Sequence, residues 1–176
     1  MRKLTSGLMG LSALALITLP ARAQKEAEVQ EVIQEFQKKD PGMKTVFEDA
    51  YGYAVFPNVG KGGLVVGGAH GNGLVYERGK LIGKTELTAV TFGLQAGGQS
   101  FREVIFFKDK TALDDFTRGN FEFQGGLSAV ALKEGVSKSL NYNKGVAVVS
   151  AAKGGLMAEA SVGGQKFKYE PVKENP

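Results

Sequence analysis

The sequence contains no cysteine and a single histidine, His70. The absence of cysteine excludes disulfide bonds, thiol catalysis and thiolate metal sites together. A catalytic or metal-binding histidine needs partners, and the chain offers neither a second histidine nor a thiolate. We therefore interpret His70, which stands beside Gly71-Asn72-Gly73, as a solvated residue of a turn.

Carboxylates in a catalytic arrangement are also missing. Asp114 and Asp115 are adjacent on a predicted helix, so their side chains point about 100° apart and do not share a proton. Glu103 stands alone in a predicted strand. Because no acid–base pair and no nucleophile beside its base can be composed, we expect a protein that is not an enzyme, with no catalytic residues, no metal site and no cofactor.

The N-terminal apolar run is too short for a comfortable membrane span, which needs about 20 residues. It follows Arg2 and Lys3 and leads to Ala21-Arg22-Ala23. This pattern predicts a signal peptide over residues 1–23, cleaved between Ala23 and Gln24; the alternative is a retained membrane anchor. Cleavage predicts that the mature protein is periplasmic or secreted.

A large excess of one charge is missing from the predicted mature chain. The full sequence has 22 basic and 18 acidic residues, but Arg2, Lys3 and Arg22 leave with the signal peptide. The remaining net charge is about +1. A net-charge argument for nucleic-acid binding therefore fails, and any basic site must be a local patch.

The mature sequence opens with a segment typical of an amphipathic helix. Apolar side chains recur at helical spacing between residues 24 and 40: Val29, Val32, Ile33 and Phe36. This stripe can dock on a core or touch a membrane, and docking is favoured because the segment is acidic whereas helices that bind anionic lipid are basic. We assign residues 24–44 to an N-terminal amphipathic helix region, with a second short helix over 43–50.

Residues 45–176 are typical of a β-rich domain. Short β-branched and aromatic runs alternate with glycine-rich turn signals, which indicates an antiparallel meander. Gly71-Asn72-Gly73 and Arg78-Gly79-Lys80 are predicted hairpin turns.

One further helix is predicted near residues 111–118. Thr111 is its expected cap, Asp114 is the capping-box partner three residues on, and Gly119 ends it. The predicted fold is therefore α+β: a strongly curved, glycine-rich antiparallel β-sheet, barrel-like, with the N-terminal helix and this further helix.

Glycine supplies 25 of the 176 residues, yet the spacings that bind nucleotides are not met. The dinucleotide fingerprint G-x-G-x-x-G fails, and Gly79 lies one residue too close to Gly83-Lys84-Thr85 for a Walker loop. We expect no nucleotide ligand. The doublets Gly62-Gly63 and Gly154-Gly155 instead predict bends with positive φ or close backbone contacts.

The candidate binding residues are cations and glycines at glycine-rich turns, because backbone N–H groups there can form anion-binding concavities. They are Lys61, Gly62, Gly63, Arg78, Lys80, Lys84, Lys144, Lys153, Gly154 and Gly155. Lys61 and Lys153 occupy matching places in a weak internal repeat around Lys-Gly-Gly-Leu, so a joint site is one hypothesis. The alternative is that these lysines only solubilise the turns and block aggregation.

Four blocks of sequence resemble, in order, the SYLF domain family: YAVFPNVGKGGLVVGGAHGNGLVY, TFGLQAGGQSFREVIFF, ALDDFTRGNFEF and KGGLMAEASVGG. The resemblance covers about residues 45 to 170 and is to the exported bacterial branch of the family. It implies a curved β-sheet core with flanking helices. It also implies binding to membrane lipid, which is phosphoinositide in eukaryotic members, some of which are described as actin-binding.

Two hypotheses about function follow. The first is a non-enzymatic envelope protein that binds anionic lipid or an anionic membrane surface, with no nucleic acid and no nucleotide as partner. The alternative is a periplasmic structural or protein-interaction module without direct lipid binding, which the near-neutral charge and the acidic first helix favour. The sequence names no protein partner.

Overall fold

The computed structural model describes residues 20–63, 66–92, 99–123, 127–153, 160–161 and 164–173. Residues 1–19 of the predicted signal peptide and the predicted bend at Gly154-Gly155 lie outside these ranges. Among the helices of the described ranges, none is long and apolar enough to cross a membrane.

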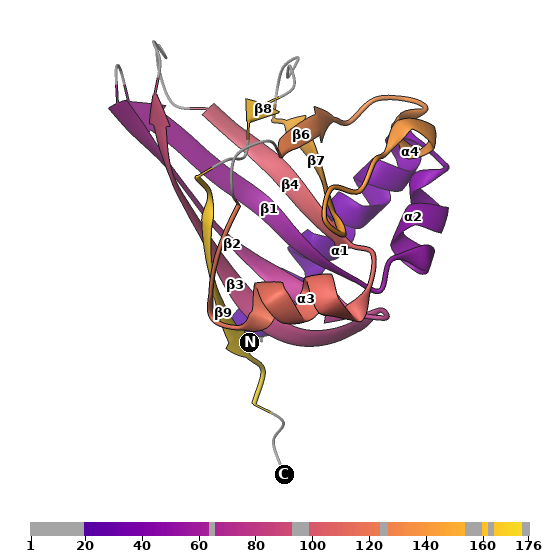
Figure 1. Ribbon diagram of the computed structural model, residues 1–176, viewed down its shortest axis with the longest axis horizontal. Coiled ribbons are helices and arrows are strands. Elements are labelled where there is room, and N and C mark those ends of the chain that lie inside the picture. Colours follow the sequence, from indigo (N-terminus) through magenta and orange to yellow (C-terminus); the bar gives the residue numbers. More distant parts are fainter. Residues whose placement is uncertain are drawn as a thin grey trace, which may run out of the picture.

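A strongly curled half-barrel sheet forms the centre of an α+β fold, which confirms the predicted fold class (Figure 1). Its described strands lie in the order β5-β9-β3-β2-β1-β4-β7-β6-β8. The long central strand β1 pairs antiparallel with both β2 and β4, whereas β6 and β7 pair in parallel. The strands are β1 (Gly52–Gly63), β2 (Val66–Glu77), β3 (Lys80–Phe92), β4 (Gln99–Phe107), β5 (Asn120–Glu122), β6 (Ser128–Ala131), β7 (Val146–Ala152), β8 (Ala160–Ser161) and β9 (Lys166–Pro171).

Helices cover both faces of this sheet (Figure 1). They are α1 (Ala21–Lys39), α2 (Met43–Asp49), α3 (Lys110–Thr117) and α4 (Val136–Ser139). The sheet curls around α3, which contacts β9 as well as β1 and β4. Helices α1, α2 and α4 pack against the opposite face. We call these two surfaces the α3 face and the α1 face.

Strand alternation divides the core between the two faces. In β1, Ala54 and Phe56 pack on the α3 face, while Tyr53 and Val55 pack on the α1 face. The α3 face is rich in phenylalanine: Phe56, Phe101, Phe107, Phe116, Phe123 and Phe167 are all buried there. Where both faces of the sheet are covered, the paired segments of β1, β4 and β7 are continuous apolar runs in the sequence: residues 53–56, 104–107 and 146–149.

The predicted N-terminal helix is confirmed, and its apolar stripe docks on the sheet. The residues that α1 buries are the predicted ones: Val29, Val32, Ile33 and Phe36. The helix ends before Asp40, whose carboxylate accepts hydrogen bonds from the backbone N–H of Gly42 and of Ser137 in α4. These bonds lower the pKa of Asp40 and tie the end of α1 to α4.

The predicted turn at Arg78-Gly79 is confirmed, with φ of 48° at Arg78 and 79° at Gly79. The predicted turn at Gly71-Asn72-Gly73 is wrong, because these residues lie inside β2. His70 is exposed, as expected, but belongs to the same strand and not to a turn.

The glycines of β2 permit close packing against β1. A Cβ atom at Gly73 would lie 2.6 Å from the carbonyl oxygen of Val55 and 2.8 Å from the ring of Phe56. Gly62 does not behave as predicted, because its φ is not positive and a Cβ atom there would meet nothing within 4 Å. Tight contact therefore occurs in the middle of the β1–β2 pair and not at Gly62.

Helix α3 is present as predicted, but its cap is different. Asp109, and not Thr111, is the N-cap, and its carboxylate accepts a hydrogen bond of 2.9 Å from the backbone N–H of Ala112. Asp114 forms an ion pair with Lys110 instead of closing a capping box. The short helix α4 was not expected, since four residues give no helical period to recognise.

Candidate functional site

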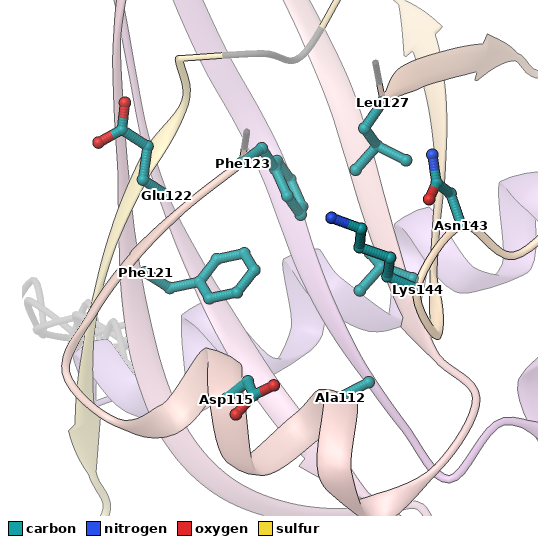
Figure 2. A pocket seen from close by; sticks show the side chains of 9 residues that line it. Ala112, Asp115, Phe121, Glu122, Phe123, Leu127, Asn143 and Lys144 are labelled. Atoms are coloured by element: carbon teal, nitrogen blue, oxygen red, sulfur yellow. The ribbon is translucent and has the colours of Figure 1, made fainter. Parts of the chain in front are cut away.

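A pocket of about 330 Å³ opens beside α3. Segments distant in the sequence form it: α3, β5 with the residue after it, Leu127 before β6, and the turn between Asn143 and Val146 (Figure 2). We call it the α3 pocket. Its lining residues are Ala112, Asp115, Phe121, Glu122, Phe123, Leu127, Asn143, Lys144 and Val146.

The wall of the α3 pocket is apolar and aromatic. Phe121 and Phe123 meet edge to face, with ring centroids 5.3 Å apart, and each also contacts Phe167 in the core. Phe121 and Leu127 are only partly buried, so they present apolar surface to the pocket. The pocket is thus an open extension of the phenylalanine core on the α3 face.

One lysine lies at the mouth of this pocket. Figure 2 shows the Lys144 side chain reaching across the pocket, with its amine between Phe123 and Leu127. The carboxylate of Asp115 forms an ion pair of 3.1 Å with Arg118, and that of Glu122 lies 3.7 Å from Lys166 Nζ and points away from the pocket. Among the described residues, no carboxylate forms an ion pair with Lys144.

The backbone fixes the position of Lys144. Asn143 and Val146 exchange two backbone hydrogen bonds, of 2.8 and 3.0 Å, around a two-residue turn. Within it Lys144 has φ of 49° and Gly145 has φ of 79°. The Gly145 carbonyl accepts a bond from Lys108 N–H, and a Cβ atom at Gly145 would lie 2.9 Å from the Cβ of Ala112. Glycine here lets the turn sit directly against α3.

The other predicted cations do not form a common site with Lys144. Arg78 stacks its guanidinium 4.9 Å from the ring centroid of Tyr51, and Lys80 begins β3. Lys84 lies in the middle of β3, opposite Leu74 and Glu170 of the neighbouring strands. The strand around Lys84 agrees with the absence of a phosphate-binding loop there.

Lys61 and Lys153 do not form the joint site of the hypothesis. Val59 packs on the α3 face, so alternation along β1 places Lys61 on that face as well. Lys153 lines a groove on the other side of the sheet together with Gly60, Arg102 and residues of α1. We call this the α1 groove. Gly62 and Gly63 end β1, and Gly154 and Gly155 lie outside the described residues.

The α1 groove carries charges of both signs. Arg102 forms an ion pair of 3.1 Å with Glu35, and Lys25 forms one of 3.1 Å with Glu28. Because the cations at its α1 side are matched by carboxylates of the helix, the groove is a weaker candidate for an anion site than the α3 pocket.

Glu103 has an environment that its isolated place in the sequence does not indicate. This residue is fully buried on the α3 face, where Gln165 Nε2 donates a hydrogen bond of 3.2 Å to Glu103 Oε2. Within the described residues, Glu103 Oε1 has no hydrogen-bond partner, and neither has Ser150 Oγ on the facing strand. Burial raises the pKa of Glu103 to about 7. Glu103 is two residues from Phe101 and from Ile105, and four from Phe107. Because alternate residues of a strand share a face, this spacing indicates that Glu103 points inward with them.

The acidic and histidine side chains of the described residues bear on metal binding and on acid–base chemistry. Among them, no group of three or more His, Asp or Glu residues could hold a metal ion. Asp114 and Asp115 pair separately with Lys110 and Arg118, as their positions on the helix predict.

Comparison with known proteins relates this chain to a described family. Residues 88–173 match the model of a family described as Ysc84, a Las17-binding protein actin regulator. The chain is also 33% identical over 131 residues to Beta cell expansion factor A of Aeromonas veronii. That match covers 73% of this chain and 49% of the relative, so the chain spans about half the length of the curated relative it matches.

The family description is that of a binding or regulatory domain and not of a known enzyme family. The chain therefore belongs to the Ysc84 (SYLF) domain family.

Proposed function

We propose that this chain is a non-enzymatic lipid-binding module of the cell envelope, and that the α3 pocket holds an anionic amphiphile. The observation that carries the proposal is the combination of an aromatic, partly exposed pocket wall with Lys144 at its mouth. Ligand pockets are mostly apolar, with a few polar groups that fix orientation. An amphiphile matches both parts, because its chain contacts Phe121, Phe123 and Leu127 while its head group meets the lysine.

Electrostatics supports an anionic head group over a cationic one. Asp115 and Glu122 already have cationic partners, whereas Lys144 forms no ion pair with a described residue. A charge-assisted bond from a lysine to a carboxylate or phosphate is stronger than a neutral one. The near-neutral mature charge also places the attraction in this local site and not in the whole surface.

A second candidate function is a protein-interaction module. The α1 groove favours it, because its paired charges are more typical of a polar protein surface than of a lipid site. The family description as a Las17-binding protein and actin regulator names protein partners, so it supports this second candidate.

Lipid recovery tests the proposal. Delipidated protein is incubated with a mixture of anionic and zwitterionic lipids, isolated again by size exclusion, and its bound lipid is quantified by mass spectrometry. We expect anionic lipid on the wild type and less on Lys144→Asn, which removes the charge while suiting the positive φ. Lys133→Asn, at an exposed position outside the α3 pocket, is the matched control and should retain lipid. Recovery of no lipid by any of these proteins would contradict the proposal.

A further inference from the structure

We infer that the α3 pocket accepts one acyl chain bearing one anionic head, and so selects single-chain amphiphiles over two-chain phospholipids in a bilayer. Fatty acids and lysophosphatidic acids share this chemistry, with a carboxylate or a phosphate as the head. The inference rests on the proposed function and specifies the ligand class of the same site.

The size and the walls of the pocket set the number of chains. Its volume of about 330 Å³ is at the low end of the range of roughly 300–1,000 Å³ for small-molecule sites. Helix α3 bounds one side and the Asn143–Val146 turn bounds another, and that turn is held to α3 by the close approach of Gly145 to Ala112. The space between these two walls cannot widen unless this packed contact separates.

The charges at the mouth set the number of anionic groups. Among the described lining residues Lys144 is the lysine, and in the view of Figure 2 its side chain extends toward Phe123 and Leu127. The Asp115 carboxylate at the same pocket is held by Arg118. One accessible cation beside a carboxylate fits a single anionic head at the end of a chain.

An anionic bilayer surface fits the same face poorly. Attraction to such a surface grows with the number of nearby lysines and arginines. Around the pocket the cations Lys110, Arg118 and Lys166 already pair with Asp114, Asp115 and Glu122. Burial of an acyl chain against Phe121, Phe123 and Leu127 therefore has to supply most of the affinity.

The experiment compares ligands that differ in chain number and in head charge. The full mature chain is titrated calorimetrically with laurate and with lauroyl lysophosphatidic acid, both below their critical micelle concentrations. Dodecyl maltoside serves as a neutral single-chain probe, and vesicles of dioleoyl phosphatidylglycerol serve as a two-chain anionic surface. We expect saturable one-to-one binding of the two anionic single-chain probes, and weaker binding of the maltoside and of the vesicles.

Variants of the lining residues separate the head from the chain. Lys144→Asn should weaken laurate binding by about tenfold or more, as expected for a lost bond to a charged group, and should leave dodecyl maltoside binding unchanged. Leu127→Trp, which fills the pocket, should abolish binding of both probes, with circular dichroism as the check on folding. Lys133→Asn should bind like the wild type.

The outcomes distinguish this inference from the proposed function. Tight binding of vesicles or recovered diacyl lipid, with no binding of laurate or of lysophosphatidic acid, would overturn the inference and leave lipid binding standing. Equal laurate affinity in the wild type and in Lys144→Asn would also overturn it, even if Leu127→Trp failed to fold. If no probe binds and no lipid is recovered from mixtures, both the inference and the proposed function are contradicted.

Discussion

The buried carboxyl group of Glu103 makes the stability of this domain depend on pH. Its cross-strand neighbours, Phe56 and Ser150, carry no charge, and its hydrogen-bond partner Gln165 is neutral. Burial raises its pKa from 4.5 to about 7, although the bond from Gln165 opposes the rise. In the unfolded chain the group is solvated and loses its proton near the ordinary value. Between these two pKa values the folded state binds more protons than the unfolded state.

We therefore expect the free energy of unfolding to fall as pH rises from about 4.5 to 7 and to level off above that. A pKa shift of this size corresponds to a decrease of about 3 kcal/mol in the free energy of unfolding. Glu103→Gln keeps the shape without the charge, so it should remove most of this slope and be more stable than the wild type at pH 8. Urea unfolding at pH 5, 6, 7 and 8 measures both proteins. An identical slope in the two would show that Glu103 is not responsible.

Two glycines of the β1–β2 pair differ in whether a side chain would fit in their place. At Gly73 a Cβ atom would overlap the Val55 carbonyl, whereas at Gly62 it would meet nothing within 4 Å. Gly73→Ala should lower the free energy of unfolding by about 1–3 kcal/mol, the usual cost of overpacking. Gly62→Ala is the matched control and should stay within about 0.5 kcal/mol of the wild type. Denaturant titration of the two variants tests this difference in stability. Equal unfolding midpoints for Gly73→Ala and Gly62→Ala would refute it.

The sequence did not distinguish these glycines, because both stand in the same glycine-rich stretch. What separates them is the backbone that faces each one across the strand pair, and that depends on a register shift in β1 between Val55 and Val59. A shift of this kind leaves no periodic signal in a single strand. The turn predicted at Gly71-Asn72-Gly73 failed for the same reason, since its glycines serve strand packing.

At the scale of elements, periodicity predicted the helices better than their ends. The stripe of α1 was predicted residue by residue because it repeats over two turns. The start of α3 was misplaced by two residues, since Asp109 and Thr111 are both good caps and only the extended backbone at Asp109 decides between them.

The capping residue of α3 can be tested directly. Asp109→Ala removes the acceptor of the Ala112 N–H and should cost about 1 kcal/mol of stability. Thr111→Ala is the matched control, because Thr111 is exposed within the helix, and it should change stability little. Thermal unfolding followed by circular dichroism compares the two. A larger loss in Thr111→Ala than in Asp109→Ala would reverse the assignment.

The order of the strands in the sheet was harder to predict from the sequence than the strands themselves. Alternating runs indicated a meander, and β1, β2 and β3 do pair in sequence order. The return of β4 to β1, the pairing of β9 with β3 and the parallel pair β6–β7 involve partners distant in the chain. Each of these pairings joins segments that are separated along the chain, and the residue pattern of one strand does not encode which partner it will pair with.

At the scale of the whole molecule, the candidate site is a product of the fold. Lys144 was one of six cations near glycine turns, and nothing adjacent to it in the sequence sets it apart. Phe121 and Phe123 reach it from β5 and the following residue, and Leu127 from the residue before β6. The sequence therefore predicted a set of cations that could bind an anion. It did not predict which of these cations faces an apolar pocket.

The last prediction concerns the mature chain as a whole. Helix α1 begins at Ala21, but the first residue that it buries is Val29. Cleavage between Ala23 and Gln24 would remove the exposed Arg22–Glu26 pair and the backbone hydrogen bond from Gln24 N–H to the Pro20 carbonyl, both in the first turn of the helix. Exposed ion pairs contribute little to stability. We propose that export removes residues 1–23, and that residues 24–176 keep the fold.

Intact-mass analysis of envelope extracts should find a species that begins at Gln24. The purified 24–176 chain should melt within about 2 °C of a longer chain that begins at Pro20, because both retain every buried contact of α1. Val29→Asp is the informative contrast, since it places a charge in the α1 core and should lower the melting temperature strongly. A membrane-bound species that retains Met1 would contradict the processing prediction. A marked loss of stability in the 24–176 chain would show that the first turn of α1 contributes more than its exposed contacts indicate.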